Sequence, residues 1–110
     1  MANNQRLLGM LGFAMRAGKL IVGSELVCRA MPRRDAGRIV LVVIASNVSD
    51  ATAKRLKTKS EFYGIRSVTI DMTTDELGAH LGKTYTPACV GVCDEGFASE
   101  IEKAVSSAAT

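Results

Sequence analysis

The stretch from Ile39 to Ala45 reads IVLVVIA, a continuous apolar run that is rich in β-branched residues and has no polar alternation. Such a run is typical of a strand that is buried on both faces of a sheet. A strand of this kind needs helices on both sides of its sheet. The sequence on either side of the run therefore has to supply those helices and the neighbouring strands.

The chain before this run begins with a helical pattern. Leucine, methionine and alanine residues recur at helical spacing between residues 7 and 14, which predicts a first helix. Asn3 or Asn4 can cap its start. Gly18 is placed to end it, because glycine adopts the left-handed backbone conformation at little cost.

A short strand and a second helix come next. Leu20–Val22 is a brief apolar run suited to the edge of a sheet. Gly23 then turns the chain, and Ser24 can cap a helix that runs to about Met31, with Pro32 marking its end.

After the central run the pattern continues with a helix, a strand and another helix. Ser49 can cap a helix that Gly64 ends, and residues 67–72 predict the next strand. Thr73 and Glu76 have the spacing of a capping box, which predicts that a fourth helix follows this strand.

The last elements complete an alternating order of helices and strands. Gly82 can end the fourth helix, and residues 88–92 predict a fourth strand. Asp94 and Glu95 suit the positive start of a final helix. The order αβαβαβαβα predicts an α/β fold, a three-layer α-β-α sandwich with a mixed sheet of about four strands, built as a single domain over residues 1–110.

Charge is unevenly distributed along the chain. Residues 1–40 carry seven Lys or Arg and two Asp or Glu, whereas residues 71–110 carry two Lys or Arg and seven Asp or Glu. A basic N-terminal part is typical of a protein that contacts a polyanion through those residues. The alternative is that these charges are simply solvated faces.

Several classes of site find no support in the residues. Cys28, Cys89 and Cys93 lack the spacing of a zinc site, and three thiols in apolar surroundings indicate a reducing, cytoplasmic compartment. No nucleophile is placed for His80, which we interpret as a surface or packing residue. The sequence predicts no enzyme, metal, cofactor or small-molecule substrate, and no signal peptide or membrane span.

The residues from Gly18 to Arg29 contain the best candidate for a binding site. The second helix starts with unpaired backbone N–H groups and a partial positive charge, which suit phosphates or base edges. Lys19 and Arg29 place cations near the same point. The alternative is an ordinary strand-to-helix connection with solvated cations.

Five segments in their order along the chain carry a resemblance to a known family. The segments are LLGMLGFAMRAGKLIVGSE, IVLVVIAS, KRLKTKSEFYGI, DELGAHLGK and PACVGVCDEGFASEI. Together they cover nearly the whole chain and resemble the ribosomal protein L7Ae/L30e superfamily, with its small bacterial YlxQ-like branch nearest. The resemblance implies an α-β-α sandwich that binds kink-turns, which are RNA helices bent sharply at a bulge beside tandem sheared G·A pairs.

The resemblance also implies a set of RNA-binding residues. Gly23 would allow close backbone approach, Ser24 and Glu25 would contact polar edges of the RNA, and Lys19 and Arg29 would contact its backbone. A second surface would be the loop before the last strand, whose apolar edge packs against looped-out nucleotides, with the turn after the central strand nearby. That loop and that turn comprise Tyr85, Thr86, Pro87, Ala88, Ser46 and Asn47.

The expected function is therefore non-catalytic binding of structured RNA, associated with the ribosome or with translation. Leu26 stands where ribosomal relatives often carry a polar residue. The exposed aromatic expected at Tyr85 could stack on an unstacked base, or its ring could pack on the sheet edge. A protein-interaction adaptor on the same fold is the alternative function, because some members of the superfamily bind proteins.

Overall fold

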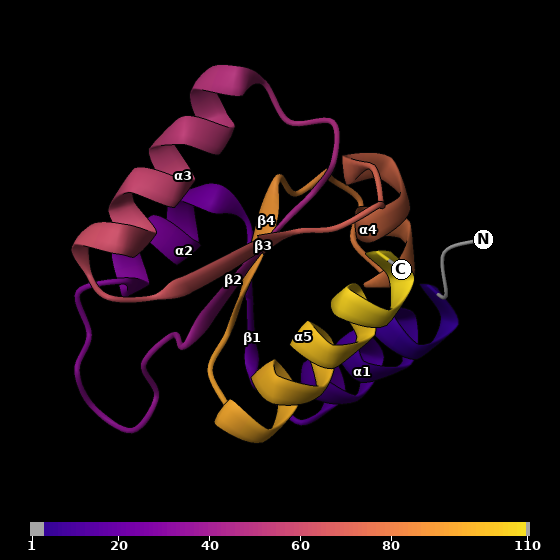
Figure 1. The fold of residues 1–110 in the computed structure, drawn as a ribbon, viewed down its shortest axis with the longest axis horizontal. Helices are drawn as coiled ribbons and strands as arrows, with labels where there is room; N and C mark the ends of the chain where they lie inside the picture. Colours follow the sequence, from indigo (N-terminus) through magenta and orange to yellow (C-terminus); the bar gives the residue numbers. More distant parts are fainter. Residues whose placement is uncertain (1–3, 110) are drawn as a thin grey trace.

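A four-stranded sheet between two layers of helices forms the structure, a computed structural model that describes the backbone of residues 4–109 and the side chains of residues 5–106 (Figure 1). The elements are α1 (Asn4–Arg16), β1 (Leu20–Val22), α2 (Ser24–Ala30), β2 (Leu41–Ile44), α3 (Asp50–Phe62), β3 (Arg66–Thr69), α4 (Thr74–His80), β4 (Cys89–Val92) and α5 (Glu95–Ala109). The predicted element order and the predicted α/β class are confirmed.

The central strand β2 is buried on both faces, as its composition predicts. All four of its residues have no solvent exposure. Leu41 and Val43 belong to a core cluster with residues of α1, α4 and α5. Val42 and Ile44 belong to a second cluster with residues of α2 and α3. Figure 1 shows the same division, with α1 and α5 on one side of the sheet and α2 and α3 on the other.

The strands lie in the order β1-β4-β2-β3, which makes the sheet mixed. Strand β4 pairs antiparallel with both β1 and β2, while β2 and β3 run parallel. At one end of the sheet, Val92 lies opposite Leu20 and Leu41. At the other end, Cys89 lies opposite Ile44, close to where β1 finishes. The two ends of the sheet therefore carry different connections.

Most of the predicted helix ends are confirmed. Helices α1, α3 and α4 are each followed by a glycine in the left-handed region, with φ of 72° at Gly18, 68° at Gly64 and 70° at Gly82. The Ser49 hydroxyl oxygen accepts a hydrogen bond from the Thr52 N–H at the start of α3. The capping box of Thr73 and Glu76 is present at the start of α4.

The predicted cap of α2 is wrong. Gly23 occupies the N-cap position, with φ of 106° and ψ of 143°, and Ser24 is the first residue inside the helix. Glycine has no side chain, so α2 has no side-chain cap hydrogen bond. The helix begins one residue earlier than a Ser24 cap would allow, because Gly23, with its positive φ, takes the cap position itself. The predicted cap of α1 by Asn3 or Asn4 lies outside the described side chains.

The strands are shorter than the apolar runs that predicted them. Strand β3 spans Arg66–Thr69 and not residues 67–72, although the Ile70 N–H still donates to the Ile44 carbonyl oxygen. Strand β2 likewise covers the middle four residues of its seven-residue run. In both places burial extends beyond the regular ladder, since Ile39, Ala45 and Met72 are buried outside the strands.

Two further observations bear on the sequence analysis. All three cysteines are free thiols. Among the helices of residues 4–109, none combines the length and the apolar character that crossing a membrane requires.

A single glycine in β4 tests the packing of the α2 side of the sheet. A Cβ atom at Gly91 would lie 2.8 Å from Cδ1 and 3.1 Å from Cγ1 of Ile39, which is buried. We expect Gly91→Ala to lower the free energy of unfolding by about 1–3 kcal/mol, as overpacked cores do. Urea denaturation followed by circular dichroism measures the change.

The matched control for this prediction is Gly9→Ala in α1. A Cβ atom there meets nothing within 4 Å, and the residue is exposed inside a helix. Alanine should therefore raise stability by about 0.5–1 kcal/mol. Equal stability of the two variants would show that Ile39 does not pack against β4 as described.

Candidate nucleic-acid interface

Two segments that are far apart in the sequence line one groove, which we call the α2 groove. Its volume is about 360 Å³. One wall comes from the end of β1 and the start of α2, and the other comes from the loop between α4 and β4. The lining residues are Val22, Gly23, Ser24, Glu25, Leu26, Tyr85, Thr86, Pro87 and Ala88.

The pairing of β1 with β4 brings these segments together. The strands are antiparallel, and Val22 lies opposite Val90, so β1 ends where β4 begins. The Gly23 N–H donates to the Cys89 carbonyl oxygen at 3.0 Å, which continues the pairing into the turn. The turn before α2 and the loop before β4 are therefore held side by side by backbone hydrogen bonds.

The α4–β4 loop rests directly on α4 at a glycine. A Cβ atom at Gly78 would lie 2.5 Å from the Tyr85 carbonyl oxygen and 3.1 Å from Cδ of Pro87. Gly78 and Pro87 are buried, whereas Tyr85 is 50% exposed and Leu26, on the facing wall, is 51% exposed. The groove thus presents two large exposed hydrophobic side chains.

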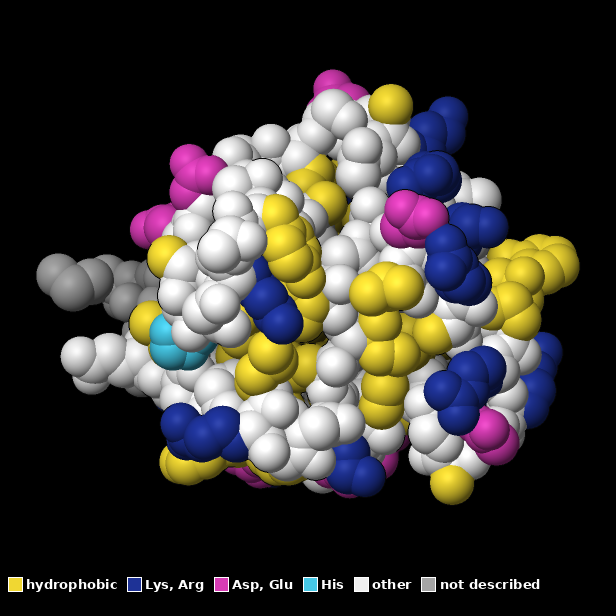
Figure 2. Space-filling view, turned by 180° about the vertical axis from the view of Figure 1, so that it is seen from behind, with side chains coloured by type: hydrophobic (Ala, Val, Ile, Leu, Met, Phe, Trp, Pro, Cys, Tyr) yellow, Lys and Arg dark blue, Asp and Glu magenta, His cyan; other side chains and the backbone are white. Residues whose placement is uncertain are grey.

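Figure 2 shows hydrophobic side chains gathered in the middle of one face, with a group of Lys and Arg side chains toward α2 and α3.

The start of α2 contributes backbone donors to the groove. The first helical hydrogen bond runs from the Val27 N–H to the Gly23 carbonyl oxygen at 3.0 Å, so the amides of residues 24–26 precede it. An added Cβ at Gly23 would meet nothing within 4 Å, so the positive φ, and not crowding, requires glycine here. The lack of a side chain leaves the backbone of this turn open to close approach.

Arg29 lies one turn further along α2 and forms an ion pair with Glu25. Its guanidinium nitrogen is 2.6 Å from the Glu25 Oε1, and the side chains of Arg29 and Glu25 are 68% and 83% exposed. Exposed pairs of this kind contribute about 0–1 kcal/mol. A phosphate can therefore replace Glu25 as the partner of Arg29 at little cost, which leaves both side chains available to a ligand.

Neither Lys19 nor Arg29 lines the α2 groove, and Lys19 does not lie near Arg29, in contrast to the sequence-based expectation. It precedes β1, at the opposite end of the strand from Gly23, and its carbonyl oxygen accepts from the Cys93 N–H. Burial raises the pKa of the Cys93 thiol, and the positive charges of Arg33 and Lys19 oppose that rise. Lys19 thus belongs with Arg33 at the far end of the sheet.

Ser46 and Asn47 lie next to the groove without lining it. The Ala45 N–H donates to the carbonyl oxygen of Ala88, which does line it. The Asn47 Oδ1 accepts from the Thr74 N–H at 2.8 Å. That side chain therefore ties the turn after β2 to the start of α4.

Cys89 and His80 have structural surroundings. Burial raises the pKa of the Cys89 thiol to about 12, so it stays neutral and unreactive near pH 7. The Nε2 of His80 is 2.7 Å from the Leu8 carbonyl oxygen, which joins α4 to α1. Within residues 4–109, no three His, Cys, Asp or Glu side chains are grouped so that they could hold a metal ion.

Sequence reasoning missed three residues of this site. Val22 and Leu26 line the groove, and Gly78 supports its loop. The signal for Leu26 was the resemblance, since its position often carries a polar residue in ribosomal relatives. No local signal identifies Gly78, because its contact is with residues on another element.

Comparison with known proteins shows a consistent set of relatives. Residues 5–102 match the model of the ribosomal protein L7Ae/L30e/S12e/Gadd45 family. The RNA-binding protein YlxQ of Enterococcus faecium is 35% identical over 103 residues, which cover 94% of each chain. The RNA-binding protein YlxQ of Bacillus subtilis is 33% identical over 92 residues, covering 84% of this chain and 87% of the relative.

Two solved structures are similar throughout. A protein of unknown function from Bacillus halodurans has a TM-score of 0.79 and 30% identity, covering 92% of this chain and 97% of the other. A 15.5 kD RNA binding protein from Giardia lamblia has a TM-score of 0.71 and 16% identity, covering 96% and 87%. The similarity to the Giardia lamblia protein shows a common fold.

The contact at Gly78 gives a prediction for the shape of the groove. Because the Tyr85 carbonyl oxygen is backbone, no side-chain rotation relieves the clash in Gly78→Ala. We expect this variant to lose about 1–3 kcal/mol of stability and to shift the amide resonances of residues 84–88. Gly12→Ala is the control, since its Cβ would lie 3.8 Å from the His80 Nε2, an ordinary contact. Unchanged loop resonances in Gly78→Ala would contradict the packing.

Proposed function

The chain belongs to the ribosomal protein L7Ae/L30e/S12e/Gadd45 family, and we propose that it is a non-catalytic protein that binds structured RNA in the α2 groove. One observation carries the proposal. The resemblance assigns RNA contacts to the residues around Gly23 and to those around Pro87, and both sets line the same groove. The relatives from E. faecium and B. subtilis are named RNA-binding proteins, which supports the same conclusion.

The proposed ligand is a kink-turn or a similarly bent RNA. Arg29 and the amides at the start of α2 supply donors for phosphates and polar base edges. The exposed side chains of Tyr85 and Leu26 supply an apolar surface for nucleotides that have left the stack, which is how proteins usually read irregular RNA. A sharp bend brings a helical backbone and looped-out nucleotides close together, so one groove can contact both. The protein then stabilises a bend that the RNA already adopts in part.

We further propose that this RNA belongs to the translation machinery and that the chain acts in the cytoplasm as one RNA-binding domain. The ribosomal proteins in the family support the first part. The free thiols support the cytoplasmic location, because reducing compartments keep cysteines unpaired. Crosslinking in cells, followed by sequencing of the recovered RNA, identifies the transcript. Recovery of no RNA above background would contradict this assignment.

RNA with and without a kink-turn tests the proposed ligand. We expect fluorescence anisotropy to show tighter binding to a hairpin with a bulge beside tandem G·A pairs than to the same hairpin with Watson–Crick pairs at those positions. Fluorescence energy transfer between the two ends of the RNA should rise as the protein binds. Equal affinities would leave RNA binding intact but exclude kink-turn recognition.

An aromatic substitution tests the groove itself. Tyr85→Ala removes the exposed ring at the groove wall, and stacking of a base on an aromatic side chain is worth about 1–3 kcal/mol. We expect at least about a fivefold loss of affinity for the kink-turn RNA. Phe62→Ala is the matched control, because this ring is 80% exposed on α3 and lies outside the lining of the groove. Equal effects of the two substitutions would place the RNA elsewhere.

Salt dependence tests the electrostatic part. If three or four phosphates are neutralised, the slope of log K against log salt should be roughly −2 to −4. Arg29→Gln should weaken binding and make this slope less negative by about one unit. Anisotropy titrations at several potassium chloride concentrations give both slopes. A wild-type affinity that does not change with salt is incompatible with this binding mode.

A further inference from the structure

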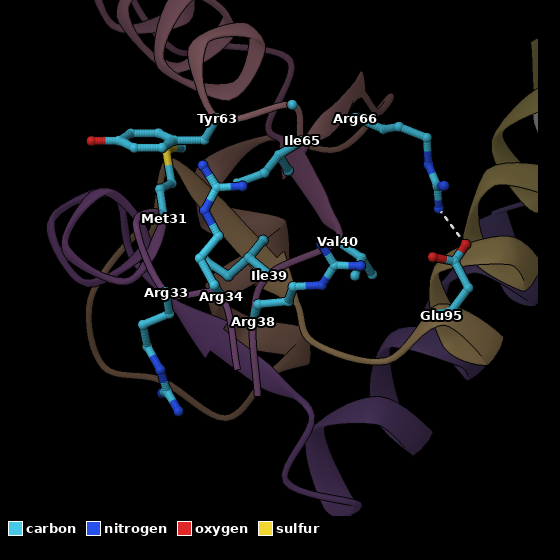
Figure 3. A pocket seen from close by; sticks show the side chains of 11 residues that line it. Met31, Arg33, Arg34, Arg38, Ile39, Val40, Tyr63, Ile65, Arg66 and Glu95 are labelled. Carbon is cyan, nitrogen blue, oxygen red and sulfur yellow. Dashed lines mark hydrogen bonds and ion pairs between the residues drawn. The ribbon is translucent and has the colours of Figure 1, made fainter. Parts of the chain in front are cut away.

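A second hollow, which we call the arginine pocket, lies at the other end of the sheet from the α2 groove. Its volume is about 100 Å³. The connection from α2 to β2, the end of α3, the start of β3 and the start of α5 surround it (Figure 3). Four arginines line it, namely Arg33, Arg34, Arg38 and Arg66.

Two of these arginines are neutralised within the protein and two are not. Arg33 contacts the Asp35 carboxylate at 3.0 Å. Arg66 pairs with two glutamates of α5, Glu95 at 2.6 Å and Glu102 at 3.1 Å. Over the described residues, Arg34 and Arg38 form no ion pair with an acidic side chain. The pocket therefore has uncompensated positive charge.

The side-chain directions also distinguish Arg33 from Arg34 and Arg38. In Figure 3, Arg34 points toward Tyr63 and Ile65, and Arg38 points toward Val40, whereas Arg33 points away from them. Both side chains line the pocket, next to the buried Ile39 side chain.

The surroundings of these two guanidinium groups suit a phosphate. Guanidinium groups bind phosphate through paired N–H donors in a fixed planar geometry. Met31 and Ile39 are buried beneath the pocket, while Arg34 and Arg38 are exposed and accessible to a ligand. Pockets for whole small-molecule ligands measure roughly 300–1,000 Å³. A hollow of about 100 Å³ therefore suits one charged group better than an entire nucleotide.

A third hollow lies along α2 between the arginine pocket and the α2 groove. It has a volume of about 310 Å³ and lies along the exposed side of α2, where Arg29 also lines it. It shares Leu26 with the α2 groove and Arg33 with the arginine pocket. The three hollows are thus neighbours along α2, and Arg29 lies between the α2 groove and the arginine pocket.

We propose that the arginine pocket binds a phosphate group through Arg34 and Arg38, and that this phosphate belongs to an RNA strand that leaves the α2 groove along α2. The source of the phosphate rests on the proposed function, whereas the phosphate site itself does not. The pocket would anchor RNA beyond the kink and lengthen the contact to the full extent of α2.

The test uses the full chain and two charge-matched double variants. Arg34→Gln/Arg38→Gln removes the two unpaired arginines. Arg16→Gln/Lys103→Gln removes the same charge from α1 and α5, on the opposite layer. We expect the first variant to bind a kink-turn RNA with long flanking helices about tenfold more weakly, with a salt slope less negative by about one unit. The second variant should bind this RNA like the wild type.

A titration of wild-type protein with inorganic phosphate, followed by the Arg Nε–H resonances, tests the site without RNA. Saturable shifts at Arg34 and Arg38, absent at Arg16, are expected. Such shifts with unchanged RNA affinity in Arg34→Gln/Arg38→Gln would uphold the phosphate site and overturn RNA as its source. No shifts and no loss of RNA affinity would overturn the whole inference. If the wild type binds no RNA, the proposed function fails, and the phosphate titration alone decides whether the arginine pocket binds phosphate.

Discussion

Burial of β2 on both faces is the constraint on which the rest of the structure depends. A strand without a polar residue cannot face water on either side, so it requires one helical layer against Leu41 and Val43 and another against Val42 and Ile44. Packing against Val42 and Ile44 fixes the direction of α2 across the sheet. That direction places the beginning of α2 at one end of the sheet and Arg33 at the other.

Backbone pairing, more than side-chain chemistry, builds the α2 groove. The antiparallel pairing of β1 and β4 places two irregular segments side by side, and the hydrogen bond from Gly23 to Cys89 extends that pairing into the turn. The side chains that face the groove are then free to serve recognition, since the strands and α4 hold their positions. This division accounts for exposed Leu26 and Tyr85 on a well-packed fold. The same rigidity suits the proposed recognition of RNA by shape.

The fold could be predicted from the sequence because its signals are local. An unbroken apolar run, glycines after helices and a capping box each act within a few residues. The site was harder to predict, because its geometry depends on contacts between distant elements. Lys19 is only four residues from Gly23, yet an extended strand separates them and puts the lysine at the other end of the sheet. Ser24 failed as a cap because Gly23 already takes that position. Arg33 and Arg34 could be proposed from the sequence as phosphate contacts, but their pocket could not, since Arg38 and Arg66 line it together only after β2 and β3 pair.

The strand order has a consequence for how the protein is made. Strand β4 lies between β1 and β2, although it is the last strand in the chain. During synthesis, β1 therefore cannot pair with β4 until residues 89–92 have emerged from the ribosome. One wall of the α2 groove belongs to the loop just before those residues. A nascent chain consequently has no complete groove in which to hold RNA until β4 has been made, and the activity proposed for it can start only then.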